Sequence, residues 1–250
     1  MIYFFFLDKK KETELPSRSE SPTSHGFVET RLFADGLHHV HIHHTELRTL
    51  VQELRKKIIG MDEFIHAIVL NLLCGGHLLV EGVPGLAKTK TIHAFSEVMG
   101  MQFKRVQFTP DMLPADIMGT EIYNAASKNF EAKIGPIMTN ILLADEINRA
   151  TPKVQSALLE AMQEHQVSIG GTSYPLPDPF FVLATQNPLE QEGTYPLPEA
   201  QIDRFLFKIL VDYPNLHEEK KILDEQEHED KIPLQKLFSH ETFLSLRDQV

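Results

Sequence analysis

The segment from Gly82 to Thr89 has the residue types of a loop that binds phosphate. It reads GVPGLAKT and follows the pattern G-x-x-x-x-G-K-[ST], except that Ala87 replaces the last glycine. In such loops, backbone N–H groups and the positive end of the following helix attract phosphate oxygens. Lys88 would add a positive charge for the β- and γ-phosphates, and the Thr89 hydroxyl could bind Mg²⁺. The alternative is a Gly/Pro turn before a helix, which the Lys-Thr pair disfavours.

Two polar strand ends follow further along the chain. The apolar run 141–144 ends in Asp145 and Glu146. An Asp in this place can hold Mg²⁺, and a neighbouring Glu can activate the attacking water as a general base. The alternative for this pair is a cap on the next helix. A second apolar run, 180–184, leads to Asn187, which could reach the γ-phosphate or orient the water, although Asn-Pro alone is a turn signal.

Alternating strand and helix patterns must bring these groups together. Short apolar runs predict strands over 77–81, 103–108, 141–144, 180–184 and 205–211. Helical periodicity predicts helices over 47–58, 62–73, 89–99 and 154–162. This alternation predicts a mostly parallel sheet covered on both faces, whose ligands bind at the carboxyl ends of the strands. Cys74, at the end of the second helix, is expected to be a small core residue.

The composition is that of a globular protein with an acidic balance. Of the 250 residues, 42% are hydrophobic and 24% are charged, and the formal net charge is −11. No apolar run approaches the roughly 18 residues that a membrane span needs. The acidic balance disfavours nucleic acid as the main partner, because proteins that wrap DNA carry a basic face. The single cysteine allows no intrachain disulfide and favours a reducing compartment, so we predict a cytoplasmic protein.

The first 45 residues differ from the rest. Residues 16–24 are rich in Ser, Thr, Pro and Glu, and we expect them to be disordered. Residues 37–44 hold five of the thirteen histidines. Alternate histidines at 39, 41 and 43 could share one face of a strand and bind a metal. A solvated leader is the favoured interpretation, because no Cys or acidic partner lies beside them at ligand spacing.

Six segments, in order, resemble the MoxR family of AAA+ ATPases over roughly residues 47–214. They are GHLLVEGVPGLAKT (76–89), QFTPDMLPAD (107–116), LLADEINR (142–149), QSALLEAM (155–162), ATQNP (184–188) and EGTYPLPEAQIDRF (192–205). The resemblance implies a P-loop AAA+ core of three αβα layers with a five-stranded parallel sheet, β-hairpin insertions and the start of an α-helical lid. The implied domains are a disordered leader at 1–45, a nucleotide-binding core at 46–213 and a partial lid at 214–250.

The same resemblance implies ATP and Mg²⁺ as cofactors and assigns residues to them. The nucleotide set is Gly82, Val83, Pro84, Gly85, Leu86, Ala87, Lys88, Thr89 and Lys90, with Ile59 and Gly60 lining the adenine pocket. The metal set is Thr89 and Asp145, the Walker A threonine and Walker B aspartate. The catalytic set is Glu146, Lys88, Asn187 as the sensor-1 residue and Arg204 as an arginine finger on the neighbouring subunit. For Arg204, a local ion pair with Asp203 or Glu199 stays open.

Two insertions and a departure also bear on the resemblance. Residues 111–136 resemble the helix-2 insert of this clade, with a returning strand at 130–133, and 167–174 should form a hairpin because Gly170-Gly171 suits a two-residue turn. The alternative for both insertions is a rigid surface excursion without a partner. Beyond Pro214 the lid motif Gly-x-Ser-Pro-Arg is missing, so we expect the chain to stop within the lid. Residues 218–230 should form a solvated, charged helix.

The resemblance implies a Mg²⁺-dependent ATPase that assembles as a ring, expected to be a hexamer. Such a ring would remodel or mature client proteins, often together with von Willebrand factor A-domain proteins. Two alternatives stay open. A nucleic-acid motor of the same clade would bind DNA or RNA in a salt-dependent way, against the net charge. A nucleotide-dependent interaction module would bind ATP without turnover, as the missing lid arginine suggests.

Overall fold

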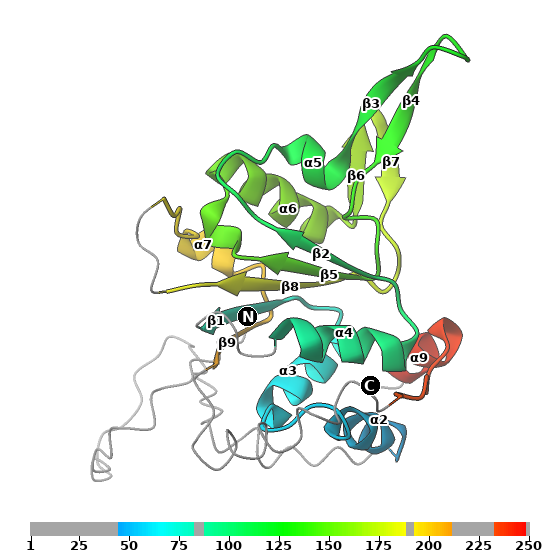
Figure 1. Ribbon diagram of the computed structural model, residues 1–250, viewed down its shortest axis with the longest axis vertical. Coiled ribbons are helices and arrows are strands. Elements are labelled where there is room, and N and C mark those ends of the chain that lie inside the picture. The colour runs from blue at the N-terminus through cyan, green and yellow to red at the C-terminus, as the bar shows by residue number, and fades with distance from the viewer. Residues whose placement is uncertain (1–44, 83–87, 189–192, 212–232, 249–250) are drawn as a thin grey trace, which may run out of the picture.

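Five parallel strands form a sheet between two layers of helices (Figure 1). The computed structural model describes residues 45–82, 88–188, 193–211 and 233–248. Across the sheet the strands are β2 (Phe103–Gln107), β5 (Ile141–Asp145), β8 (Phe181–Gln186), β1 (Leu78–Gly82) and β9 (Phe207–Val211). Every neighbouring pair is parallel. The predicted α/β fold with a five-stranded parallel sheet is therefore confirmed.

Two hydrophobic clusters lie on the two faces of the sheet. The central strands β5 and β8 are buried on both faces, as their unbroken apolar sequences predict. One face is covered by α2 (Thr45–Arg55), α3 (Asp62–Leu73), α4 (Lys88–Met99) and α9 (His240–Arg247). The other is covered by α5 (Pro114–Met118) and α6 (Pro152–Glu164), with the short α7 (Glu199–Ile202) beside them. Burial of apolar side chains on both faces fixes the strand ends relative to each other.

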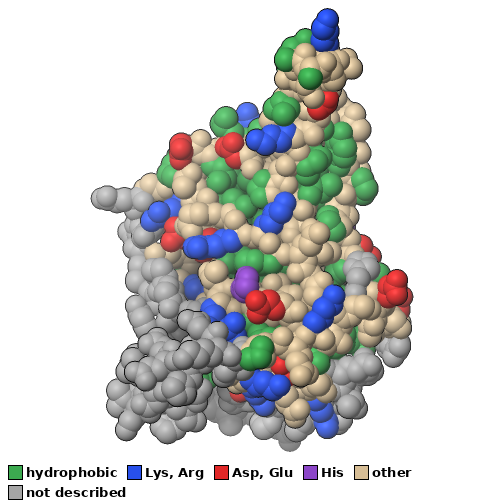
Figure 2. All heavy atoms as spheres, turned by 45° about the vertical axis from the view of Figure 1, so that its right-hand side comes forward, with side chains coloured by type: hydrophobic (Ala, Val, Ile, Leu, Met, Phe, Trp, Pro, Cys, Tyr) green, Lys and Arg blue, Asp and Glu red, His purple; other side chains and the backbone are tan. Residues whose placement is uncertain are grey.

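Both predicted insertions are antiparallel hairpins. The first pairs β3 (Gly119–Asn124) with β4 (Asn129–Ile134), and the second pairs β6 (Gln166–Ile169) with β7 (Thr172–Pro175). Gly170 and Gly171 both have positive φ, as the tight turn between β6 and β7 requires. The β3–β4 hairpin projects beyond the core (Figure 1), and hydrophobic side chains are exposed along it (Figure 2). Near its end, the exposed rings of Tyr123 and Phe130 meet edge to face.

Two details differ from the sequence predictions. Cys74 is exposed, so its expected place in the core is wrong. Cys74 is the capping residue directly after α3. The chain bends away from the helix at Gly75, where φ is 64°, and the Cys74 side chain does not join the buried stripe of α3. Strand β9 begins at Phe207, because Leu206 N–H donates to His77 O at 2.9 Å and holds the preceding residues in a turn.

The C-terminal residues 233–248 pack against the helices of the first cluster. The backbone N–H of Gln235 donates to Glu53 Oε1 at 2.9 Å, and Phe238 and Phe243 are buried in the cluster. The predicted leader, its histidines and the charged run 218–230 lie outside the described residues, and the domain boundaries stay a prediction. Of the helices in the described part, none is both long and apolar enough to cross a membrane.

Candidate functional site

The predicted polar strand ends meet at one edge of the sheet. Gly82 ends β1, Asp145 ends β5, and Asn187 directly follows β8. These three strands are neighbours and parallel, so their carboxyl ends lie side by side. Lys88 opens α4 at the same edge, because only the loop 83–87, outside the described residues, separates it from β1. The fold thus gathers the residues that the sequence singled out at the place where parallel sheets bind ligands.

Lys88 is a buried cation at this edge. Its Nζ donates to Gly82 O at 2.9 Å. Burial lowers the pKa of the Lys88 ammonium from its ordinary value, and the charges of Asp145 and Glu146 oppose that shift. Thr89 and Lys90 follow it in the first turn of α4 and are half-buried. A lysine shielded from water beside a helix N-terminus is a site suited to an anion.

Both carboxylate oxygens of Asp145 are engaged. Oδ1 accepts from Thr185 Oγ1 at 2.7 Å, and Oδ2 accepts from Arg105 Nε at 3.1 Å and Nη2 at 2.6 Å. The Thr185 hydroxyl also accepts from the backbone N–H of Glu146 at 2.8 Å. Thr185 is buried, so this single hydroxyl fixes the orientation of Asp145 and of the residue after it.

Glu146 is held by side chains rather than by a helix end. Its backbone is left-handed, with φ 56°, which is uncommon for a non-glycine residue. Oε2 accepts from Gln107 Nε2 at 2.7 Å and pairs with Arg149 Nε at 3.1 Å. The carboxylate makes no capping bond to the 3₁₀-helix η1 (Ile147–Arg149). The alternative that it caps the next helix is therefore wrong for this structure.

Sequence reasoning missed four polar partners of the two carboxylates: Arg105, Gln107, Arg149 and Thr185. The strand register contains the signal that could have found two of them. Gln107 pairs with Asp145 across β2 and β5, and Arg105 lies two residues earlier on the same face of the sheet. Since β2 precedes β5 in the chain, a prediction of their pairing would have placed both side chains beside Asp145.

Three other predicted site residues are Asn187, Ile59 and Gly60. Asn187 is buried, and its backbone oxygen accepts from Asn148 Nδ2 at 3.3 Å. Ile59 and Gly60 lie in the connection between α2 and α3, where Gly60 has φ 71°. Their predicted contacts with the γ-phosphate and with the adenine base stay predictions.

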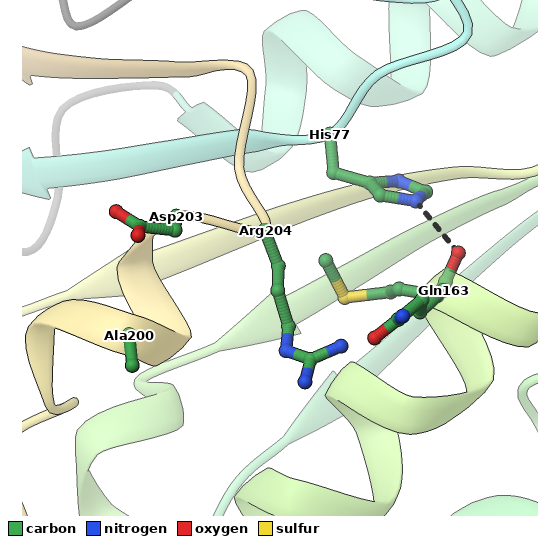
Figure 3. Close-up of a pocket in the computed structure, with 6 residues that line it drawn as sticks. His77, Gln163, Ala200, Asp203 and Arg204 are labelled. Carbon is green, nitrogen blue, oxygen red and sulfur yellow. Dashed lines mark hydrogen bonds between the residues drawn. The ribbon is translucent and has the colours of Figure 1, made fainter. Parts of the chain in front are cut away.

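Arg204 lies at the opposite end of the sheet. The next residues turn into β9 beside His77, which precedes β1, whereas Gly82 ends β1. Five residues of strand separate these ends by about 16 Å. Figure 3 shows the Arg204 side chain reaching from the α7–β9 connection toward Gln163 at the end of α6, in a pocket of about 330 Å³. The structure thus does not bring Arg204 to the Lys88 edge of the same chain.

The guanidinium of Arg204 is available to a partner. It is exposed, and it makes no ion pair with Asp203 or Glu199, both of which are described residues. The alternative of a local ion pair is therefore wrong for this structure. Asp203 points away from Arg204 in Figure 3, and its buried Oδ1 has no hydrogen-bond partner within the described part of the chain.

The donor set fits a magnesium–nucleotide complex better than a free metal ion. No group of three or more His, Cys, Asp or Glu side chains among the described residues could hold a metal by itself. Mg²⁺ prefers one or two carboxylates together with water and phosphate oxygens. Asp145, supported by the Thr89 hydroxyl, would supply the protein part of that set, and Lys88 would bind the phosphates.

Comparison with known proteins supports the same interpretation. A sequence model for the ATPase family associated with various cellular activities (AAA) matches residues 77–207. The protein named Chaperone MoxR1 of Mycobacterium tuberculosis is 55% identical over 177 residues, which cover 71% of this chain and 47% of that protein. YeaC of Bacillus subtilis is 49% identical over 208 residues, covering 83% of this chain and 65% of YeaC.

A solved structure also matches closely. It is that of a putative ATPase from Cytophaga hutchinsonii, with a TM-score of 0.75 and 48% identity, and the match covers 82% of this chain and 62% of that one. The chain thus spans between about half and two thirds of the length of these relatives. On the family model, the relatives and the shared fold together, this chain belongs to the MoxR family of AAA+ ATPases.

Proposed function

We propose that this chain binds ATP with Mg²⁺ and hydrolyses it at sites shared between neighbouring subunits of a ring. The observation that carries the proposal is the separation of the charged groups. Lys88, Asp145 and Glu146 lie together at the carboxyl ends of the strands, and the exposed Arg204 lies at the amino ends. One chain alone cannot close such a site, whereas a neighbour that presents its Arg204 can.

Each residue has a role in the proposed reaction. Lys88 would neutralise the β- and γ-phosphates, while Thr89 and Asp145 would hold Mg²⁺, which supplies charge stabilisation to the transferring phosphoryl group. Glu146 would take the proton of the attacking water, and Asn187 would orient that water. Arg204 of the adjoining subunit would stabilise the transition state, a contribution worth about 10³–10⁵ in rate in other phosphoryl-transfer enzymes.

The proposed cellular role is remodelling or maturation of client proteins. One relative is named a chaperone, which supports this role without naming a client for this chain. The hexameric ring and a von Willebrand factor A-domain partner come from the family resemblance and stay proposals, as does the cytoplasmic location. The chain matches only part of each relative, so the partners of a whole protein could involve segments beyond this match.

The test is the ATPase rate per subunit, measured over a range of protein concentrations. Lys88→Ala, Glu146→Gln and Arg204→Ala are compared with wild type, and Lys153→Ala, an exposed lysine on α6, is the control. We expect the wild-type rate to rise with concentration, the three site variants to lose turnover and the control to keep it. Arg204→Ala should still bind nucleotide. A rate that does not depend on concentration would contradict the shared site.

The same measurement separates the second candidate, a nucleotide-dependent interaction module. That function predicts ATP binding that depends on Lys88 but turnover no higher than in Lys88→Ala. The hydrogen bonds that orient Asp145 and Glu146 at the strand end support the hydrolase, because a module that only binds nucleotide does not need an oriented general base. Salt-dependent binding of DNA would instead favour a nucleic-acid motor.

A further inference from the structure

An arginine from the edge strand holds the Walker B aspartate. Arg105 lies on β2, and two of its guanidinium nitrogens, Nε and Nη2, contact Asp145 Oδ2 at 3.1 and 2.6 Å. Nothing in the proposed hydrolysis uses this residue. An arginine on that oxygen lies where a magnesium ion or its water would approach, so its presence needs a physical explanation.

The same guanidinium is linked to the second carboxylate. Arg105 Nη2 also donates to Gln107 Oε1 at 3.1 Å, and Gln107 Nε2 donates to Glu146 Oε2 at 2.7 Å. Both links run along one face of β2, because residues two apart in a strand point the same way. A change at Arg105 is therefore transmitted to the proposed metal ligand directly and to the proposed general base through one amide.

The local charges show why this arrangement belongs to the site without nucleotide. The two carboxylates face three cations, since Arg105 pairs with Asp145, Arg149 pairs with Glu146, and Lys88 lies close to both. A divalent cation added alone would meet an excess of positive charge. Phosphate groups bound at Lys88 reverse that balance, so the metal ion becomes favourable only together with them.

We propose that Arg105 is an electrostatic latch on Asp145. It pairs with the carboxylate while phosphate is absent and leaves it when Mg²⁺ and nucleotide arrive together. This inference rests on the proposed function, because it concerns the loading of that same site. The arginine can leave at low cost, since its side chain is 49% exposed and exposed ion pairs are weak. Thr185, which is buried, keeps Asp145 oriented after the exchange.

The test is the Mg²⁺ concentration that half-saturates binding of a fluorescent ADP analogue, a measurement that needs no turnover. In Arg105→Gln we expect this concentration to fall about tenfold, because one unit of positive charge close to the divalent ion is removed. Arg105→Lys keeps the charge but loses the two-pronged contact, so its value should fall between those of wild type and Arg105→Gln.

Lys104→Gln is the matched control. Lys104 is exposed and lies on the same strand, but its side chain points to the opposite face of the sheet from that of Arg105. The substitution Lys104→Gln removes the same formal charge as Arg105→Gln. We expect it to leave the half-saturating Mg²⁺ concentration within about twofold of wild type, because salt screens exposed charges at a distance. Thermal melting of each variant without ligand checks that the fold is kept. If Arg105→Gln does not fold, Arg105→Lys alone decides: a half-saturating Mg²⁺ concentration below that of wild type supports the latch, and one that is unchanged or higher overturns it.

The outcomes separate the latch from the proposed function. A half-saturating Mg²⁺ concentration that is unchanged in Arg105→Gln relative to Lys104→Gln overturns the latch. One that rises overturns it too, because Arg105 would then orient Asp145 for the metal rather than compete for it. If the wild type binds no magnesium–nucleotide, or binds it equally well in Lys88→Ala, the proposed function fails instead.

Discussion

His77 is a buried histidine that the fold keeps neutral. Its Nδ1 accepts from the backbone N–H of Val182 at 3.1 Å, and the ring of Phe180 packs edge-on against it with centroids 5.8 Å apart. Burial lowers the pKa of His77 to about 4, against an ordinary value of 6.5. Protonation would place a charge between α6 and the sheet, and it would destroy the hydrogen bond from Val182, because a protonated Nδ1 cannot accept.

The size of the effect follows from the two pKa values. Between pH 6.5 and pH 4 the unfolded chain binds a proton at His77 that the folded chain does not bind, so the free energy of unfolding decreases as the pH falls through this window. The full loss is about 3 kcal/mol, and about 2 kcal/mol of it is expected between pH 7 and pH 5. Below pH 4 both states are protonated and the contribution of His77 becomes constant.

The assay is urea unfolding of wild type and His77→Gln at pH 7, 6 and 5. Glutamine can accept the bond from Val182 but does not titrate, so the variant should lack the part of the pH dependence that comes from His77. Gln52→Ala, at an exposed position on α2 that does not titrate, is the control and should keep the wild-type pH dependence. An equal loss of stability between pH 7 and pH 5 in wild type and His77→Gln would refute this reasoning.

Three further predictions concern the site and the projecting hairpin. Thr185→Val removes the hydroxyl shared by Asp145 and the next backbone N–H, and we expect about 1–3 kcal/mol lower stability in urea unfolding together with loss of ATPase turnover. Gly82→Ala would place a Cβ in steric conflict with the backbone oxygen of Val211, so we expect a stability loss of about 1–3 kcal/mol by thermal or urea unfolding and weaker nucleotide binding. Phe130→Ser, on the exposed hairpin, should change stability by less than about 0.5 kcal/mol in the same assay.

Each of these three predictions has an outcome that would contradict it. Stability and turnover unchanged in Thr185→Val would show that the buried hydroxyl does not orient the carboxylates. A Gly82→Ala variant as stable as wild type would mean that β9 can move away from β1 at this point. A marked loss of stability in Phe130→Ser would show that the hairpin is tied to the core more tightly than its exposure indicates.

The sequence predicted the elements well where one physical rule dominates. The central strands are unbroken apolar runs, and the observed strands Ile141–Asp145 and Phe181–Gln186 agree with the predicted 141–144 and 180–184 within two residues at either end. The helix predicted over 62–73 has those bounds in the structure, because its acidic start and the glycines after it define both ends. Local patterns were sufficient for these elements.

Contacts between distant residues could not be predicted in the same way. Arg105 and Asp145 lie 40 residues apart in sequence, and only the order of strands in the sheet makes them neighbours. Cys74 follows an apolar helix, and its exposure depends on the direction in which the next turn leaves that helix. The distance of Arg204 from the Lys88 edge likewise depends on which end of β9 it precedes, a feature of the three-dimensional fold.

Mixing two inactive variants tests the shared site most directly. Glu146→Gln and Arg204→Ala are unfolded together, refolded at equal amounts and assayed for ATP hydrolysis. If each site takes Glu146 from one subunit and Arg204 from its neighbour, random assembly restores about one quarter of the wild-type rate. A mixture of Lys88→Ala and Glu146→Gln, whose defects lie on the same side of the interface, should restore nothing. Equal recovery in the two mixtures, or none in either, would contradict the shared site.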